Sequence, residues 1–285
     1  MKNILLCTDG SAFAESVYQY GACFAIQYNA HINVLSVTDI RTQKVTSTGN
    51  LSGSIGLGAS EQLLNELVNL EHEKAKLNNQ RAKLILQNAD KTLKNEGVKE
   101  FNLIHKTGFL GDFVDEFEDN SDLIVLGKQG ESASASGIGA NVDQIIRSSH
   151  KPCLVTPLKF QPIARILVAY DGSSSSKTIL QFLGNFPSFQ RLEIHLLMVV
   201  KNSSEPIAIA RIMEAQKLLQ SAGYEPVCHV LAGETEKAIA NYITQQNISL
   251  LLMGAYGHSR IRYLAIGSTT TQILQSSSIP ILLFR

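Results

Sequence analysis

The residues best suited to bind a phosphorylated ligand lie near the C-terminal end of the chain. Gly254-Ala255-Tyr256-Gly257 follows an apolar run, and Gly267-Ser268-Thr269 comes after nine intervening residues. Glycines let the backbone approach a phosphate closely, and the first N–H groups of a helix form the positive end of its dipole. The spacing G-x2-G-x9-G-[ST] therefore predicts a phosphate-binding loop that ends at a helix start, with two hydroxyl donors.

Asp171 directly follows the apolar run Ile166–Tyr170, whose branched side chains indicate a strand buried on both faces. In an open parallel sheet, ligands bind beyond the carboxyl ends of the strands, so Asp171 and the glycine loop belong to the same edge. Two simpler readings stay open. Asp171 and Ser268 are good helix caps, and the loop cations Arg260 and Arg262 are either phosphate contacts or solvated surface charges.

The chain repeats itself. Residues 4–11 (ILLCTDGS) match residues 166–173 (ILVAYDGS), and residues 145–155 match residues 273–283. The two offsets differ by 34 residues, so the first copy is the longer one. The Pro-containing segment Pro157–Pro162 marks the boundary. A chain of 285 residues is long enough for two domains, which we place at 1–158 (the first half) and 159–285 (the second half).

Each half predicts five strands that alternate with four helices, which is typical of an α/β fold with a doubly wound, Rossmann-like parallel sheet. In the second half the elements are expected at 166–170, 174–186, 194–200, 206–222, 227–231, 234–246, 248–253, 268–278 and 281–284. The extra length of the first half is a Gly/Ser-rich segment at 47–59 and a helix over Ser60–Glu96. Its leucines (Leu63, Leu67, Leu70, Leu77, Leu84) favour a core-facing amphipathic helix, with a coiled-coil contact as the alternative.

Together, the glycine spacing, the aspartate after the first strand, the element order and the duplication resemble the universal stress protein family over nearly the whole chain. The resemblance implies an adenine nucleotide alpha hydrolase-like fold. It also implies a pseudo-dimer in which Cys153–Thr156 pairs with Ile281–Phe284, covering two sheet edges. The implied ligand is ATP, with or without Mg²⁺. The residues implied to hold it are Ala169, Tyr170, Asp171, Val199, Val200, Gly254, Gly257, His258, Gly267, Ser268 and Thr269.

The first half departs from this pattern. Gly127 and Gly130 match the first two glycines, but Gly139 follows after only eight intervening residues, and Ala140-Asn141 replaces the hydroxyl pair. One lost hydroxyl removes about 1 kcal/mol of hydrogen bonding. We therefore expect the site of the first half to be weaker or empty, unless Lys128 compensates as a phosphate contact, and ATP to be held mainly in the second half.

Several functional classes lack support in the sequence. There is no GxxxxGK[ST] loop and no GxSxG elbow, and the seven histidines show no metal-ligand spacing. We expect His195 and His229 to be core or edge residues, and nothing in the sequence supports His258 as a catalytic base. The net charge of zero gives no reason to expect nucleic acid or a membrane as partner. The four scattered cysteines and the short apolar runs favour a cytoplasmic protein with reduced thiols.

Three functions stay open at this point. The first is a nucleotide-gated regulatory module of the stress response that acts on an unknown protein partner. The second is a slow ATPase, which would be at most a weak enzyme because the sequence offers no clear nucleophile and base. The third is a ligand-binding or scaffold protein that works through the inserted segment of the first half. The sequence leaves further dimerisation of the chain undecided.

Overall fold

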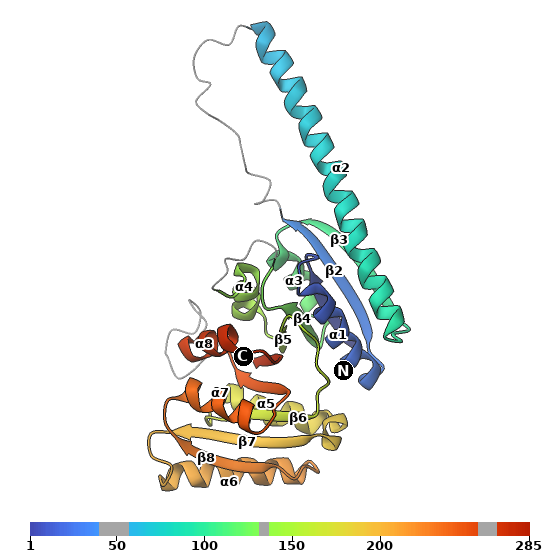
Figure 1. The fold of residues 1–285 in the computed structure, drawn as a ribbon. Coiled ribbons are helices and arrows are strands. Elements are labelled where there is room, and N and C mark those ends of the chain that lie inside the picture. Colours follow the sequence, from blue (N-terminus) through green and yellow to red (C-terminus); the bar gives the residue numbers. More distant parts are fainter. Residues whose placement is uncertain (40–56, 131–136, 256–266) are drawn as a thin grey trace.

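The strands of the two halves form one continuous ten-stranded sheet (Figure 1). In the computed structural model, the strand order is β3-β2-β1-β4-β5-β10-β9-β6-β7-β8. The structure describes residues 1–39, 57–130, 137–255 and 267–285, and only the backbone of residues 57–64 and 187–188. Neighbouring strands within each half are parallel. β5 (Cys153–Thr156) and β10 (Ile281–Phe284) pair antiparallel, with Leu154 opposite Leu282. The predicted fold class and the predicted pairing of the last strands are confirmed.

The first half follows the predicted order of strands and helices. Its other strands are β1 (Asn3–Thr8), β2 (His31–Asp39), β3 (Phe101–Gly108) and β4 (Leu123–Gly127). Its helices are α1 (Ala14–Tyr28), α2 (Leu57–Asn95), α3 (Leu110–Glu118) and α4 (Ala140–Ser148). Residues 47–56 of the predicted Gly/Ser segment lie outside the described residues, and α2 begins inside that segment, at Leu57.

The second half repeats the arrangement, and its elements begin and end within two residues of the predicted positions. Its strands are β6 (Arg165–Ala169), β7 (Glu193–Val200), β8 (Val227–Ala232), β9 (Leu250–Gly254) and β10. Its helices are α5 (Ser174–Asn185), the 3-10 helix η2 (Pro187–Arg191), α6 (Pro206–Ser221), α7 (Thr235–Gln245) and α8 (Ser268–Ser276). Among the described residues of the second half, η2 is the one element that was not expected from the sequence.

Helices cover both faces of the sheet, and alternate strand residues separate two cores. On β1, Ile4 and Leu6 face the core that contains side chains of α1, α2, α5 and α6. Leu5 and Cys7 face the core beneath α3, α4, α7 and α8. Burying each such aliphatic side chain stabilises the fold by about 1.5–3 kcal/mol. The central strands β1, β4, β6 and β9 therefore contain runs of apolar residues that are buried on both faces.

An aromatic cluster fixes the two halves beside their shared strand pair. Tyr28 of α1 packs edge-on against Phe186, with ring centroids 5.2 Å apart, and Phe24 lies 6.1 Å from Phe189. Phe284 of β10 meets Phe182 of α5 at 5.0 Å. Such pairs add about 0.5–1.5 kcal/mol each beyond their buried area. The halves thus share a core as well as a sheet.

Helix α2 projects well beyond the rest of the molecule (Figure 1). Only its C-terminal part packs on the sheet, through buried residues such as Ala82, Ala89 and Leu93. The expectation of a core-facing leucine face is wrong for the leucines whose exposure is described. Their exposed fractions are 49% for Leu67, 62% for Leu70, 65% for Leu77 and 62% for Leu84. No helix in the described part of the chain combines the length and apolarity needed to cross a bilayer.

Candidate functional site

A cavity of about 400 Å³ opens at the carboxyl ends of β1, β2 and β4 in the first half. Its walls are the end of β1, the end of β2, the loop after β4, the start of α4 and one face of α2. This is the edge at which open parallel sheets bind ligands, because strand ends and helix starts expose unpaired backbone groups there. The cavity therefore lies at the predicted edge of the sheet, but in the half whose site the sequence predicts to be weaker or empty.

The turn after the first strand has the same geometry in both halves. Asp9 accepts a hydrogen bond from the backbone N–H of Ser11 at 2.9 Å, and Asp171 accepts one from Ser173 at 2.9 Å. The intervening glycines have positive φ values of 74° at Gly10 and 79° at Gly172, a conformation that glycine adopts without strain. The helix cap of α5 is Ser173, whose hydroxyl accepts from Ser176, so Asp171 shapes the turn and does not cap the helix.

The two helices that close the site also start alike. The N-cap of α4 is Gly139, with φ −59° and ψ 139°, and the N-cap of α8 is Gly267, with φ −57° and ψ 141°. Glycine has no side chain that could accept from the first N–H groups of the helix, and such a helix start can receive an anion. Ser268 is the first residue of α8 and is exposed, so the reading of Ser268 as a mere N-cap is wrong.

The structure brings the described members of the predicted site to one edge of the second half. Ala169, Tyr170 and Asp171 lie at the end of β6, Val199 and Val200 at the end of β7, Gly254 at the end of β9, and Gly267, Ser268 and Thr269 at the start of α8. Their counterparts in the first half all line the cavity: Cys7, Thr8, Asp9, Val37, Thr38, Gly127, Gly139, Ala140 and Asn141. Gly257, His258, Arg260 and Arg262 lie outside the described residues.

Tyr170, like its counterpart Thr8, is buried towards the core that contains side chains of α1, α2, α5 and α6. Tyr170 is only 4% exposed and packs in the core shared with Ile212 and Ala215 of α6. Burial raises the pKa of its hydroxyl. Its backbone N–H donates to the carbonyl of Leu197 at 2.9 Å. Tyr170 therefore holds the end of β6 in place from the core side.

Sequence reasoning missed the contribution of the helix that follows the second strand. Asn78, Arg81 and Ile85 of α2 line the cavity, and the Arg81 guanidinium lies 3.5 Å from the carbonyl oxygen of Asp9. A Cβ atom at Gly10 would stand 2.6 Å from the Cγ1 of Ile85. The only signal in the sequence was their spacing of three and four residues, which places them on one helix face. Which face meets the turn depends on tertiary packing.

The counterpart of this contact in the second half carries a charge. Arg211 of α6 lies beside Gly172, 3.4 Å from the position that a Cβ atom would take. A guanidinium next to the Asp171 turn is a further cation at the predicted nucleotide edge, besides the loop arginines. Nothing in the local sequence around Arg211 distinguished it from a surface residue.

Lys128 does not face the cavity of its own half. Its ammonium group donates to the carbonyl oxygens of Gln275 at 2.5 Å and Ser277 at 3.2 Å, at the C-terminus of α8. The expectation that Lys128 compensates as a phosphate contact is therefore wrong. Burial lowers the pKa of Lys128. The residue joins the loop of the first half to the helix that closes the site of the second.

The side chains around the described cavity favour binding over nucleophilic chemistry. Burial raises the pKa of the Cys7 thiol far above its ordinary value, which makes its thiolate scarce at neutral pH. Thr8 shares a hydrogen bond of 2.8 Å with the hydroxyl of Tyr18, whose pKa burial raises to about 12. These groups stay neutral at physiological pH.

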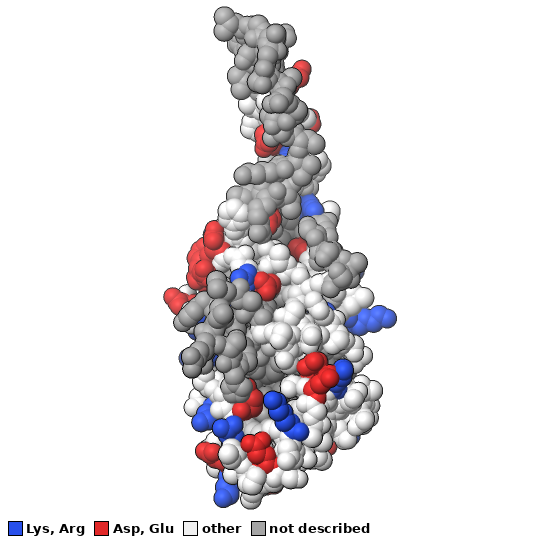
Figure 2. All heavy atoms as spheres, turned by 90° about the vertical axis from the view of Figure 1, so that its left-hand side faces the viewer, with Lys and Arg blue, Asp and Glu red and all other residues white. Residues whose placement is uncertain are grey.

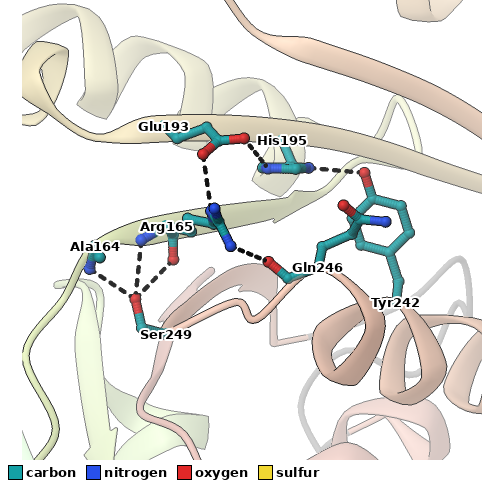
Figure 3. A network of polar contacts seen from close by, with 7 residues as sticks. All are labelled: Ala164, Arg165, Glu193, His195, Tyr242, Gln246 and Ser249. Carbon is teal, nitrogen blue, oxygen red and sulfur yellow. Dashed lines mark hydrogen bonds and ion pairs between the residues drawn. The ribbon is translucent and has the colours of Figure 1, made fainter.

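The buried histidine lies away from this edge. His195 is 2% exposed and bonds through Nδ1 to the hydroxyl of Tyr242 at 2.8 Å and through Nε2 to Glu193 at 3.1 Å (Figure 3). Glu193 in turn accepts from Arg165 at 2.8 Å. Glu193 and Arg165 begin β7 and β6, so the network lies toward the amino ends of the strands. His195 is a core residue, as predicted, and His229 is an exposed residue of the edge strand β8.

Known proteins match the chain along its whole length. A sequence model of the universal stress protein family matches residues 1–157 and again residues 162–285. Universal stress protein Slr1230 from Synechocystis sp. (strain ATCC 27184 / PCC 6803 / Kazusa) is 53% identical over 287 residues, covering 100% of both chains. The solved structure of a universal stress protein from Archaeoglobus fulgidus DSM 4304 is 19% identical, with a TM-score of 0.73 over 99% of this chain and 96% of that chain. A putative universal stress protein from Pseudomonas aeruginosa UCBPP-PA14 is 13% identical, with a TM-score of 0.64 over 100% and 93%.

Proposed function

This chain belongs to the universal stress protein family, and we propose that it is an ATP-binding regulatory protein whose main nucleotide site lies in the second half. The observation that carries the proposal is the matched backbone of the two copies. The Asp-Gly turns and the glycine N-caps of α4 and α8 agree within 5° in the cited angles. In the first half this backbone surrounds a cavity of about 400 Å³, so the second half has the same frame for a ligand.

The second half is the better phosphate site because of its side chains. Ser268 and Thr269 offer hydroxyls at the start of α8, where the first half has Ala140 and Asn141. Arg211 places a guanidinium beside the Asp171 turn, as Arg81 does beside the Asp9 turn, so the preference for the second half rests on the hydroxyls. Each charge-assisted hydrogen bond to a phosphate contributes about 1.5–3 kcal/mol. The hydroxyls favour ATP in the second half and leave the first half the weaker site.

A regulatory role follows from what this site offers chemically. Backbone N–H groups, hydroxyls and a guanidinium bind and orient a nucleotide, whereas hydrolysis also needs a positioned water and a base. Asp171, the carboxylate of the predicted site, accepts a hydrogen bond from Ser173 within its own turn. We therefore propose that bound ATP orders the second half for a protein partner in the cytoplasm and is not turned over at a significant rate.

Calorimetric titration of ATP with Mg²⁺ tests the proposal with two matched variants. The double variant Gly257→Gln/Ser268→Ala blocks the predicted nucleotide site of the second half. Gly130→Gln blocks the equivalent position of the first half, where a Cβ atom would stand 2.6 Å from the Asp9 carboxylate. We expect one site per chain that is lost only in the first variant, with no phosphate release. Binding lost only in Gly130→Gln would move the site to the first half, and a folded wild type that binds nothing would overturn nucleotide binding altogether.

The cavity of the first half supports a second candidate function, a ligand site that works through α2. Its wall includes Asn78 and Arg81 from the helix that projects from the molecule. A ligand held there would contact α2 directly. A thermal-shift screen for small ligands on the wild type and on Arg81→Gln tests this function. It is favoured if Arg81→Gln binds as many ATP molecules per chain as the wild type but no longer binds another small ligand.

A further inference from the structure

The projecting helix α2 carries a stripe of exposed leucines. Leu70, Leu77 and Leu84, here called the leucine stripe, are 62–65% exposed and follow one another at steps of seven residues. Seven residues are close to two helical turns, so the three side chains lie along one side of the helix. The buried contacts of α2 with the sheet are made by other residues, among them Ala82 and Ala89. The stripe therefore faces away from the core of its own chain.

Leucines at steps of seven residues occupy one of the two core positions of a coiled-coil repeat. Single exposed apolar residues are normal on protein surfaces, but a heptad series of leucines buries efficiently only against another helix with a similar series. In the sequence, Leu63 extends the series by one more heptad towards the start of α2. A second α2 offers the same spacing, and therefore matches the stripe without any further assumption.

The charges of α2 are segregated along its length. Residues 61–73 contain four glutamates and no Lys or Arg, whereas residues 74–94 contain six Lys or Arg and one aspartate. Figure 2 shows red spheres towards the projecting end of α2 and blue spheres closer to the body. In a parallel pair, acidic segments would lie side by side and repel. In an antiparallel pair, the acidic segment of each helix lies along the basic segment of the other.

We propose that α2 is a self-association surface, through which two copies of this chain pair by an antiparallel, two-fold contact between their α2 helices. If the two-fold axis passes between residues 73 and 74 of each helix, Leu70 lies against Leu77 of the second copy. Glu71 then lies beside Lys76 of the second copy. The two-fold symmetry repeats each contact. The 39-residue helix is about 58 Å long, and the antiparallel arrangement puts the two bodies at opposite ends of the pair.

Light scattering on the full chain tests the pairing. We expect a mass of twice 31.1 kDa for the wild type and a monomer for Leu70→Ser/Leu77→Ser, with unchanged circular dichroism. The matched control is Ile207→Ser/Met213→Ser on α6, which removes apolar residues that are 59% and 51% exposed and should leave the dimer intact. A wild type that stays monomeric at every concentration, or a dimer that survives the leucine substitutions, overturns the proposal.

Cross-linking tests the direction of the pair. After mixing and mild oxidation, chains with Leu70→Cys and chains with Leu77→Cys should form a disulfide-linked dimer, which neither variant nor the wild type forms alone. Cross-linking of Leu70→Cys with itself would show a parallel pair and overturn the antiparallel register. Charge reversal gives an independent reading: Glu71→Lys should weaken the dimer several-fold, and Glu71→Lys/Lys76→Glu should restore it. Failure of the double variant to recover would refute the Glu71–Lys76 contact.

Discussion

Lys128 is predicted to stabilise the second half from its position in the first. Its ammonium group donates to two carbonyl oxygens at the C-terminus of α8, at 2.5 and 3.2 Å. Helix α8 has no basic residue of its own in its last turn, so Lys128 supplies the positive charge that complements the negative end of the helix dipole. The substitution Lys128→Met keeps most of the stem and removes the charge and both hydrogen bonds.

The expected loss is about 1–2 kcal/mol. A hydrogen bond from a charged group contributes about 1.5–3 kcal/mol when buried, and a cation at a helix C-terminus about 0.3–1 kcal/mol when exposed. The contribution of Lys128 should lie between these limits because its side chain is half-buried. Burial also removes its charge from water, which lowers its pKa and offsets part of the gain. A loss of this size lowers the melting temperature by a few degrees in a domain of this length.

Urea unfolding measures this loss against two controls. Lys128→Arg keeps a cation and should lie between the wild type and Lys128→Met. Lys177→Met removes an exposed charge on α5 and should change the unfolding free energy by less than about 0.5 kcal/mol. If Lys128→Met and Lys177→Met unfold at the same urea concentration, the contact contributes nothing and the reasoning from the helix dipole is refuted.

Further predictions concern one carboxylate and two glycines. Burial alone would raise the pKa of Glu118, but hydrogen bonds from the hydroxyl of Ser149 and from two backbone N–H groups lower it overall. The contribution of the Glu118 carboxylate to stability is therefore present above its unfolded pKa of about 4.5 and is lost as the pH falls below that value. Glu118→Gln should lower the free energy of unfolding by about 1–3 kcal/mol at pH 7. In urea unfolding at a series of pH values, this variant should lose less stability at acid pH than the wild type does. Gly10→Ala should destabilise the chain by more than Gly172→Ala in thermal melts. Both positions have positive φ values, but only at Gly10 does the new Cβ atom meet a fixed apolar neighbour, at 2.6 Å, whereas the nearest atom at Gly172 belongs to a flexible arginine at 3.4 Å; equal losses would contradict the packing argument.

The sequence predicted the features that local patterns encode. Apolar runs predicted the strands because parallel strands are buried on both faces, and β10 was placed to the residue at Ile281–Phe284. The repeat predicted two copies of one sheet, and the glycines predicted the turns and helix starts. The pairing of β5 with β10 followed from the family resemblance, not from the residues.

Contacts between distant segments were not predictable in the same way. The leucines of α2 have the same spacing whether they face a core or solvent, and only the placement of Ala82 and Ala89 on the sheet shows which face is turned inward. Lys128 looks like any loop lysine until β5 and β10 are paired, because its acceptors lie 147 and 149 residues away. Periodicity defines a face of an element but does not choose its neighbour.

The exchange of helix caps links the two halves at their ligand edges. Lys128 of the first half caps α8, and Arg285 of the second half donates to the carbonyl of Ser148 at the C-terminus of α4 at 2.8 Å. Each of these helices starts with the glycine N-cap that closes a ligand edge. The cap on α8 comes from the residue between Gly127 and Gln129, both of which line the cavity of the first half. A ligand that shifts this loop therefore acts on the far end of the helix that closes the other site, so occupancy of one half should alter the affinity of the other.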